Sequence, residues 1–163
     1  MLAKLTKDSR IISPLLTRLI DQDSSAEQAY DSGRYVALEE FHEAIRTNLE
    51  NILNTRKQWL SFPNQCVELE QSLVNYGVHD FAHSYYGKET SQNQLCRDIK
   101  NLIQLFEPRL KRVQVSVQKN NIAIERSLKL RIEAMVDLSP HPAEPAVFES
   151  SMDISKHTFN FVA

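Results

Sequence analysis

Two histidines, His79 and His83, have the spacing of a metal-binding pair. Residues four apart share one face of a helix, so both imidazoles could reach a single ion. No third ligand follows at a motif spacing, and the His-Glu-x-x-His pattern of zinc peptidases is absent. The pattern therefore favours two surface or packing histidines. The sequence predicts no bound metal and no cofactor.

Acidic side chains are plentiful, but none lies in a motif for catalysis. Glycoside hydrolysis needs two carboxylates across a cleft, one of which must hold a proton. Glu107 has the most distinctive surroundings, yet the neighbouring Arg109 would stabilise its charged form instead. Cys66 and Cys96 lie in no known catalytic motif, and Gly-x-Ser-x-Gly does not occur. We therefore expect no catalytic residue, and we expect that the chain is not an enzyme.

The most unusual local string runs from Phe106 through Glu107, Pro108 and Arg109 to Leu110. Pro108 disfavours helix at the residue before it, so a helix should end near Phe106. Side chains two apart on an extended chain share a face, so Glu107 and Arg109 would point the same way. A carboxylate and a guanidinium on a rigid joint suit charge-assisted hydrogen bonds to a partner. The alternative is a helix stop flanked by two solvated charges.

Two long amphipathic helices are predicted before this joint. The first runs from about Tyr35 to about Thr55 and has an apolar face formed by Leu38, Phe41, Ile45, Leu49 and Ile52. The second follows a capping box at Ser91–Gln94 and has an apolar face formed by Leu95, Ile99, Leu102, Ile103 and Phe106.

Two shorter helices are predicted as well. Ser13 and Pro14 resemble an N-cap with proline at the first helical position, beside a stripe of Ile12, Leu15, Leu16, Leu19 and Ile20. A second short helix from Val67 to Val74 would end near Gly77.

After the joint the apolar period changes from 3.6 to 2. Alternation from Val113 to Val117 and from Leu128 to Val136, across a turn at Asn120-Asn121, predicts an antiparallel pair of strands. A proline-rich loop is expected at Ser139–Pro145, followed by strands at Val147–Ile154 and His157–Val162. Helices first and strands second indicate an α+β fold, with N-terminal helices packed on a small mixed or antiparallel sheet of about four strands.

The chain has 163 residues, a length for one compact domain. Residues 1–34 are expected to form an N-terminal helix and a polar connector, and residues 35–163 a single domain. The formal net charge of −2 gives no electrostatic reason to expect a nucleic acid partner. No apolar stretch has the length of a membrane span or a signal peptide, so we expect a cytoplasmic protein without direct membrane insertion.

Four segments, in order along the chain, resemble the family of phage baseplate wedge proteins and TssE-type subunits of type VI secretion systems. They are Leu15–Asp21 (LLTRLID), Leu49–Arg56 (LENILNTR), Tyr76–Asp80 (YGVHD) and Glu107–Leu110 (EPRL). The resemblance that they mark extends over most of the chain, from about Ile11 to the C-terminus. The chain departs from the family pattern at Asn48, where the family usually has aspartate. The segment from Trp59 to Tyr86 also looks diverged.

The resemblance implies a structural role in a type VI secretion baseplate. A TssE-like subunit joins the wedge formed with TssF and TssG, and with TssK, and provides a platform for the contractile sheath. It is assembled in the cytoplasm at the inner face of the cell envelope. The fold would be similar to the sheath-subunit domain, whose strands interlock with neighbouring subunits. The partner-binding residues carried over from the family are Glu107, Pro108, Arg109 and Leu110, with Asn54 and Arg56 in support.

The implied mechanism is assembly, in which exposed strand edges accept or donate strands. The candidate edges are Val147–Ile154 and His157–Val162. Two alternatives to the baseplate role remain open. The same fold serves as a regulatory anti-adaptor that binds a proteolysis adaptor. The family has also been labelled lysozyme-like, which leaves a peptidoglycan hydrolase as a further alternative.

Overall fold

The computed structural model describes residues 11–12, 14–15, 35–58, 67–79, 89–118, 127–139, 141–153, 156 and 158–161. The predicted polar connector and the turn at Asn120-Asn121 lie outside these residues, as does nearly all of the predicted N-terminal helix. The described part of the chain carries the long helices and the main sheet.

Four strands form one antiparallel sheet in the order β3-β4-β5-β6. Their bounds are β3 (Leu110–Gln118), β4 (Ser127–Val136), β5 (Glu144–Asp153) and β6 (Thr158–Phe161). The α+β fold and the antiparallel pairing of the two alternating segments are therefore confirmed. The predicted loop at Ser139–Pro145 is too long, because Pro145 lies inside β5 and is paired with Met135 of β4.

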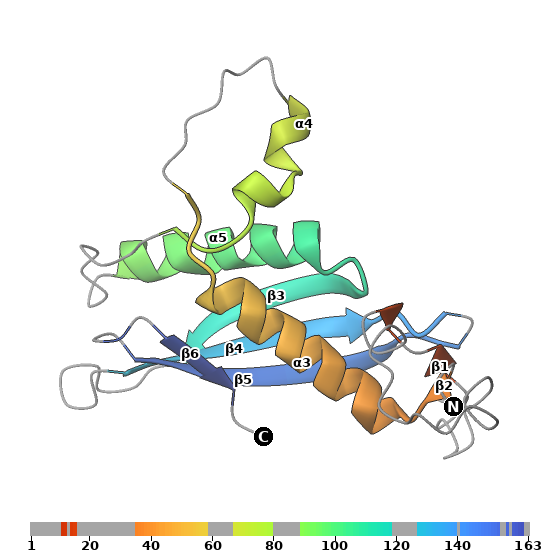
Figure 1. Ribbon diagram of the computed structural model, residues 1–163. Helices are drawn as coiled ribbons and strands as arrows, with labels where there is room; N and C mark the ends of the chain where they lie inside the picture. Colours follow the sequence, from red (N-terminus) through yellow and green to blue (C-terminus); the bar gives the residue numbers. More distant parts are fainter. Residues whose placement is uncertain are drawn as a thin grey trace.

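Both long helices cover one face of this sheet (Figure 1). They are α3 (Leu38–Asn54) and α5 (Glu89–Phe106), and the predicted apolar stripes supply their buried residues. The inward side chains of the strands complete the core, while the opposite face is polar and exposed, as expected for an antiparallel sheet covered on one side. Within the described residues, no helix is long and apolar enough to cross a bilayer.

The predicted helix starts are wrong at two places. Tyr35 and Val36 form β2, which pairs antiparallel with β1 (Ile11–Ile12), and α3 begins only at Leu38. The same pairing places Ile12 in a strand and not on a helical stripe. In α5 the helix already includes Glu89, so Ser91 is a helical residue and does not cap.

The predicted helix at Val67–Val74 is split into α4 (Val67–Glu70) and the 3-10 helix η1 (Leu73–Asn75). Gly77, shortly after η1, has φ of +102° and packs against the end of α3. A Cβ atom on Gly77 would lie 2.5 Å from the carbonyl oxygen of Thr55. Glycine is therefore required here, because it lets Val78 form a backbone bridge with Arg56.

A β-bulge interrupts the first strand after the joint. The pairing of β3 with β4 shifts register between Lys111 and Gln114, and Arg112 adopts a φ of 52°. The extra residue lets Leu110 and Val113 both point into the core, although they are three positions apart. After the bulge, the side chains of β3 alternate regularly between the core and the solvent.

Candidate partner-binding site

The segment from Glu107 to Leu110 forms a tight turn between α5 and β3. The N–H of Glu107 continues the helix by donating to the carbonyl of Ile103 at 2.8 Å, and the N–H of Leu110 donates back to the carbonyl of Glu107 at 3.1 Å. The carbonyl of Arg109 accepts from the N–H of Asp137 at 2.8 Å, just after β4. These backbone bonds hold the turn rigidly against the end of the sheet.

Glu107 is almost completely buried, with 2% of its surface exposed. Arg109 donates to both of its carboxylate oxygens, from Nε to Oε1 at 2.5 Å and from Nη2 to Oε2 at 2.7 Å. A buried charge is tolerated only when it is paired and hydrogen-bonded, and this bidentate contact provides both. The two side chains point the same way, as predicted, and they bind each other. The alternative of a helix stop flanked by two solvated charges is therefore wrong.

Helix α3 completes the environment of this ion pair. Asn48 donates from Nδ2 to Oε2 of Glu107 at 3.2 Å, and the guanidinium of Arg109 lies 5.5 Å from the ring centroid of Phe41. A second carboxylate at position 48 would repel Glu107, whereas an amide can donate to it. The asparagine that departs from the family pattern therefore suits the buried acid in this chain.

Tyr76 lies on the other side of the joint, where its ring meets Phe106 edge-on with centroids 5.0 Å apart. Burial raises the pKa of Tyr76, and the negative charge of Glu107 raises it further. Tyr76 therefore contacts the end of α5 and lies close enough to Glu107 for the carboxylate to affect its pKa. These residues belong to one packed cluster.

Arg109 also borders a surface hollow of about 290 Å³. Its side chain keeps 23% of its surface exposed, compared with 3% for the side chain of Glu107. The hollow is lined by Ile11, Ile12, Phe41, Pro108, Arg109, Asp137, Leu138 and Ser139. The joint therefore presents one oriented guanidinium beside an apolar depression.

The family model for "Baseplate wedge protein gp25" matches residues 39–141, which is more than half of the chain and includes the whole joint. The chain belongs to the gp25 family of baseplate wedge proteins. One similar solved chain comes from "The baseplate complex from the type VI secretion system", with 18% sequence identity and a TM-score of 0.49. That match covers 77% of this chain and 96% of the other. No curated protein matches the sequence.

The predicted site residues of this gp25-family protein do not all lie together. Leu110 is a core residue, and Glu107 is buried, which leaves Pro108 and Arg109 as the accessible part of the motif. Asn54 lies six residues beyond Asn48 on α3, about 9 Å along the helix axis. Arg56 is exposed and follows the end of that helix. The structure therefore separates Asn54 and Arg56 from the ion pair.

Asn54 has a defined intramolecular contact. Its Nδ2 donates to the carbonyl of Phe159 at 3.0 Å, and its Oδ1 accepts from the N–H of the same residue at 2.8 Å. The amide thus satisfies both backbone groups of one residue in β6, as a neighbouring strand would. No local sequence pattern indicates this contact, because the two residues are 105 positions apart.

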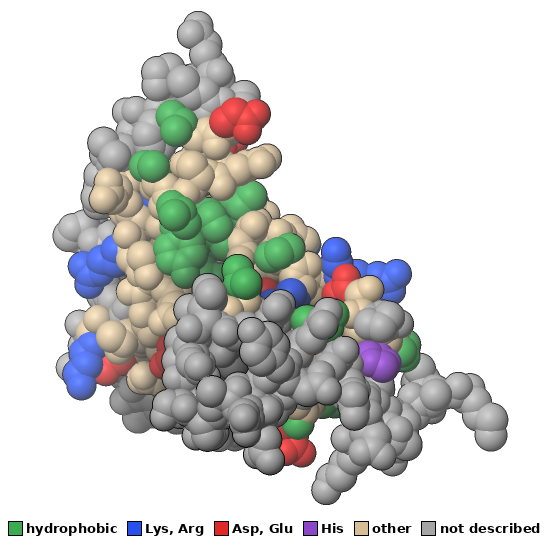
Figure 2. Space-filling view, turned by 45° about the vertical axis from the view of Figure 1, so that its right-hand side comes forward, with side chains coloured by type: hydrophobic (Ala, Val, Ile, Leu, Met, Phe, Trp, Pro, Cys, Tyr) green, Lys and Arg blue, Asp and Glu red, His purple; other side chains and the backbone are tan. Residues whose placement is uncertain are grey.

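An exposed apolar surface lies near the joint. Leu73 of η1 has 82% of its surface exposed, and Val74 and Leu105 are also exposed. Figure 2 shows hydrophobic side chains gathered on the face where η1 meets the end of α5. Large exposed apolar groups close together are typical of protein–protein contact surfaces.

A second hollow, of about 450 Å³, lies between α3 and the first half of β5. His42 of α3 lines it, and its Nε2 is buried with no hydrogen-bond partner among the described residues. Burial lowers the pKa of His42, while the nearby carboxylate of Glu144 acts more weakly in the opposite direction. The neutral imidazole is therefore the form that the folded protein favours.

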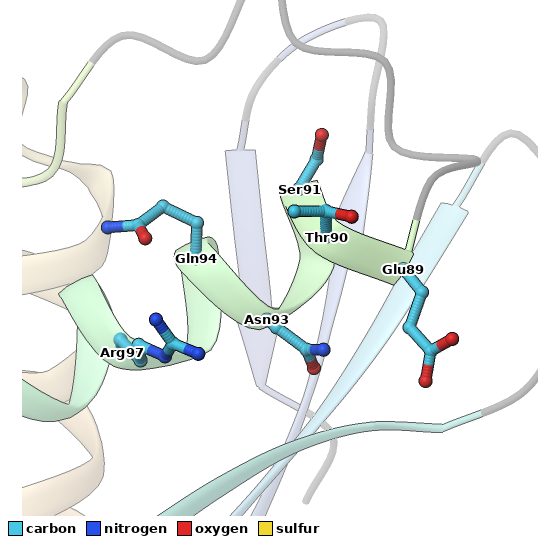
Figure 3. Close-up of a pocket in the computed structure, with 6 residues that line it drawn as sticks. All are labelled: Glu89, Thr90, Ser91, Asn93, Gln94 and Arg97. Carbon is cyan, nitrogen blue, oxygen red and sulfur yellow. The ribbon is translucent and has the colours of Figure 1, made fainter.

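A third hollow, of about 440 Å³, lies at the start of α5. The six residues that line it, from Glu89 to Arg97, belong to that one helix, and Figure 3 shows their side chains spread around it instead of converging. This arrangement does not form a catalytic constellation. Of the two histidines in the predicted pair, His79 is exposed and His83 lies outside the described residues.

The ion pair predicts unequal costs for removing its two members. Replacing Arg109 by Met leaves the buried carboxylate of Glu107 without its cation and should lower the free energy of unfolding by about 3 kcal/mol. Glu107→Gln should cost only about 1 kcal/mol, because the partly exposed guanidinium can be hydrated. Urea denaturation measures both. Arg131→Met, at an exposed pair with Glu133, is the control and should change little. Equal costs at 107 and 109 would contradict the buried pair.

His42 predicts a pH dependence of stability. Its folded-state pKa lies below the ordinary value of about 6.5, so the unfolded chain binds the proton first as pH falls. Stability supplied by the neutral imidazole is present above that value and is lost as pH falls below it. Compared with His42→Gln, the native chain should therefore lose more stability as pH falls through this range. Parallel stability curves for the two proteins from pH 7 to 5 would show the assignment to be wrong.

Proposed function

We propose that this baseplate wedge protein is a structural subunit of a type VI secretion system and not an enzyme. In this proposal it joins the wedge with TssF and TssG, with TssK nearby, and offers a platform for the contractile sheath. The assembly would take place in the cytoplasm at the inner face of the cell envelope. Family membership and the four resembling segments support the proposal.

The buried ion pair is the observation that carries the wedge contact. Glu107 holds the guanidinium of Arg109 in one orientation through two hydrogen bonds. A side chain that is already ordered loses little conformational entropy when a partner binds it. Pro108 and the apolar wall of the adjoining hollow are open beside it. The geometry therefore favours recognition of a partner group at Arg109.

The chemistry of this surface indicates what the partner would present. The exposed part of a guanidinium attracts a carboxylate or the carbonyls at the end of a helix. The neighbouring apolar wall accepts a hydrophobic side chain from the same segment. A helical bundle formed by the wedge partners, which the family resemblance implies, can offer both.

Pairing with Arg109 also leaves Glu107 poorly placed to act as a catalytic acid.

The platform for the sheath is proposed at the sheet edge. β6 pairs with only part of β5, so the first half of β5 has a strand on one side alone among the described residues. An open edge of this kind can add a strand from another chain through main-chain hydrogen bonds. The edge predicted at Val147–Ile154 therefore offers its first residues for such a contact.

Co-expression with TssF and TssG tests the wedge contact. Arg109→Lys keeps a positive charge beside Glu107 but loses the planar two-point contact. Arg131→Lys makes the same change on the exposed face of the sheet, where Arg131 pairs with Glu133, also two positions away. We expect native protein and Arg131→Lys to recover the complex, and Arg109→Lys to recover at least about tenfold less.

Circular dichroism of each purified variant separates loss of binding from loss of folding. Equal recovery by a folded Arg109→Lys would remove Arg109 from the interface and leave the family assignment intact. Failure of the native chain to recover TssF or TssG would count against the type VI wedge role itself.

A further inference from the structure

Apolar side chains are left exposed where η1 meets the end of α5. Leu73 has 82% of its surface exposed, Leu105 has 39% and Val74 has 37%. In the part of the chain that the structure describes, no other large apolar side chain is as exposed as Leu73. We call these three residues together the η1–α5 surface. Figure 2 shows hydrophobic side chains gathered on this face of the molecule.

An aromatic contact brings the two elements of this surface together. Tyr76, which follows η1, meets Phe106 at the end of α5 edge-on, with ring centroids 5.0 Å apart. Side chains three apart in a 3-10 helix lie one above the other, and the N–H of Tyr76 donates to the carbonyl of Leu73 at 3.1 Å. Leu73 is therefore on the same side as Tyr76, while Leu105 is next to Phe106 in the chain. The paired rings hold the exposed residues in one surface.

The backbone around the η1–α5 surface is already hydrogen-bonded internally. The side chains of Ser72 and Asn75 donate to the carbonyls of Leu69 and Glu70, each at 2.7 Å. Backbone N–H groups donate to carbonyls within the same segment at Gln71, Ser72, Asn75 and Tyr76. This segment therefore offers no open row of backbone groups, and a partner must satisfy its own backbone. A helix does so, because its N–H and C=O groups bond within the helix itself.

Carboxylates flank this surface on the side of α4. Glu68 and Glu70 are exposed, and neither forms an ion pair with another described residue. No lysine or arginine occurs between residues 67 and 78. Arg56 and Lys57 lie at the other end, where the N–H of Lys57 donates to the carbonyl of Val78 at 2.9 Å. A partner with basic residues toward α4 is therefore favoured, whereas an anionic lipid surface would be repelled there.

We propose that the η1–α5 surface binds an amphipathic helix of a partner protein. The apolar residues of that helix, three or four positions apart, cover the three exposed side chains. Its basic residues lie along the flank that faces Glu68 and Glu70. The inference goes beyond the proposed wedge and sheath contacts, because it uses neither Arg109 nor an edge of the sheet.

A helical peptide tests the inference. The probe is Ala-Ala-Gln-Leu-Lys-Gln-Ala-Leu-Lys-Gln-Leu-Lys-Gln-Ala, held helical by a hydrocarbon staple on its polar face, with leucines on one face and lysines beside them. The control peptide, Ala-Ala-Gln-Leu-Lys-Leu-Ala-Gln-Leu-Gln-Lys-Lys-Gln-Ala, has the same composition but spreads its leucines around the helix. Fluorescence anisotropy should show that the native chain binds the probe at least about tenfold more tightly than the control peptide. Amide NMR shifts should change at η1 and at the end of α5.

Two leucine variants examine the apolar contact. Leu73→Ser should weaken binding of the probe by about tenfold. Leu15→Ser makes the same change at a distant position in the chain, at a leucine with 69% of its surface exposed, and it should bind as the native chain does. Because both side chains are largely exposed, neither change should unfold the domain, and circular dichroism checks this.

The double variant Glu68→Gln, Glu70→Gln examines the charged flank. It should bind the probe more weakly than the native chain does, and its binding should depend less on salt concentration. Arg109→Lys should bind the probe as tightly as the native chain does. Failure of the wedge contact and failure of this contact are therefore seen separately.

Equal binding of the probe and the control peptide would overturn the proposal, and so would native affinity in Leu73→Ser. Unchanged affinity in the glutamine double variant would overturn the basic flank. Shift changes confined to the hollow beside Arg109 would place the peptide on a different surface. Flotation with vesicles of phosphatidylcholine and phosphatidylglycerol, if it were lost in Leu73→Ser, would replace the helical partner by a membrane surface.

Discussion

The rest of the structure depends on a carboxylate buried at the turn between α5 and β3. Glu107 is tolerated inside the domain because Arg109 donates two hydrogen bonds to it and Asn48 donates a third. These bonds couple the end of α5, the start of β3 and the middle of α3, which are distant in sequence. The same pair also orients the guanidinium of Arg109 at the surface. One interaction therefore both stabilises the fold and positions the side chain proposed to contact the wedge partners.

Periodicity predicted the parts of the fold that depend on local sequence. The apolar stripes identified the buried faces of α3 and α5, alternation identified β3 and β4, and Pro108 placed the end of α5 at Phe106. The errors arise where tertiary contacts decide the conformation. Tyr35 and Val36 are strand because β1 pairs with them, and the bulge at Arg112 is needed to keep Leu110 and Val113 in one core.

The residue types in the sequence were enough to identify the candidate site. They were not enough to predict its geometry. Spacing alone does not show that Glu107 and Arg109 bind each other before they meet any partner. It also does not distinguish Asn48 from Asn54, six residues apart on one helix, although the first donates to Glu107 and the second holds Phe159 of β6. One asparagine supports the ion pair and the other holds β6 at the edge of the sheet, so the surfaces proposed for the wedge and the sheath are both organised by α3.

A double-mutant cycle between positions 107 and 109 measures how strongly the stability of the fold depends on the Glu107–Arg109 pair. The free energy of unfolding is measured by urea denaturation for the isolated native chain, Glu107→Gln, Arg109→Met and the double variant. We expect the double variant to lose less stability than the two single losses combined, with a coupling energy of about 2 kcal/mol. Additive losses, with a coupling energy below about 0.5 kcal/mol, would show that the fold does not depend on this pair.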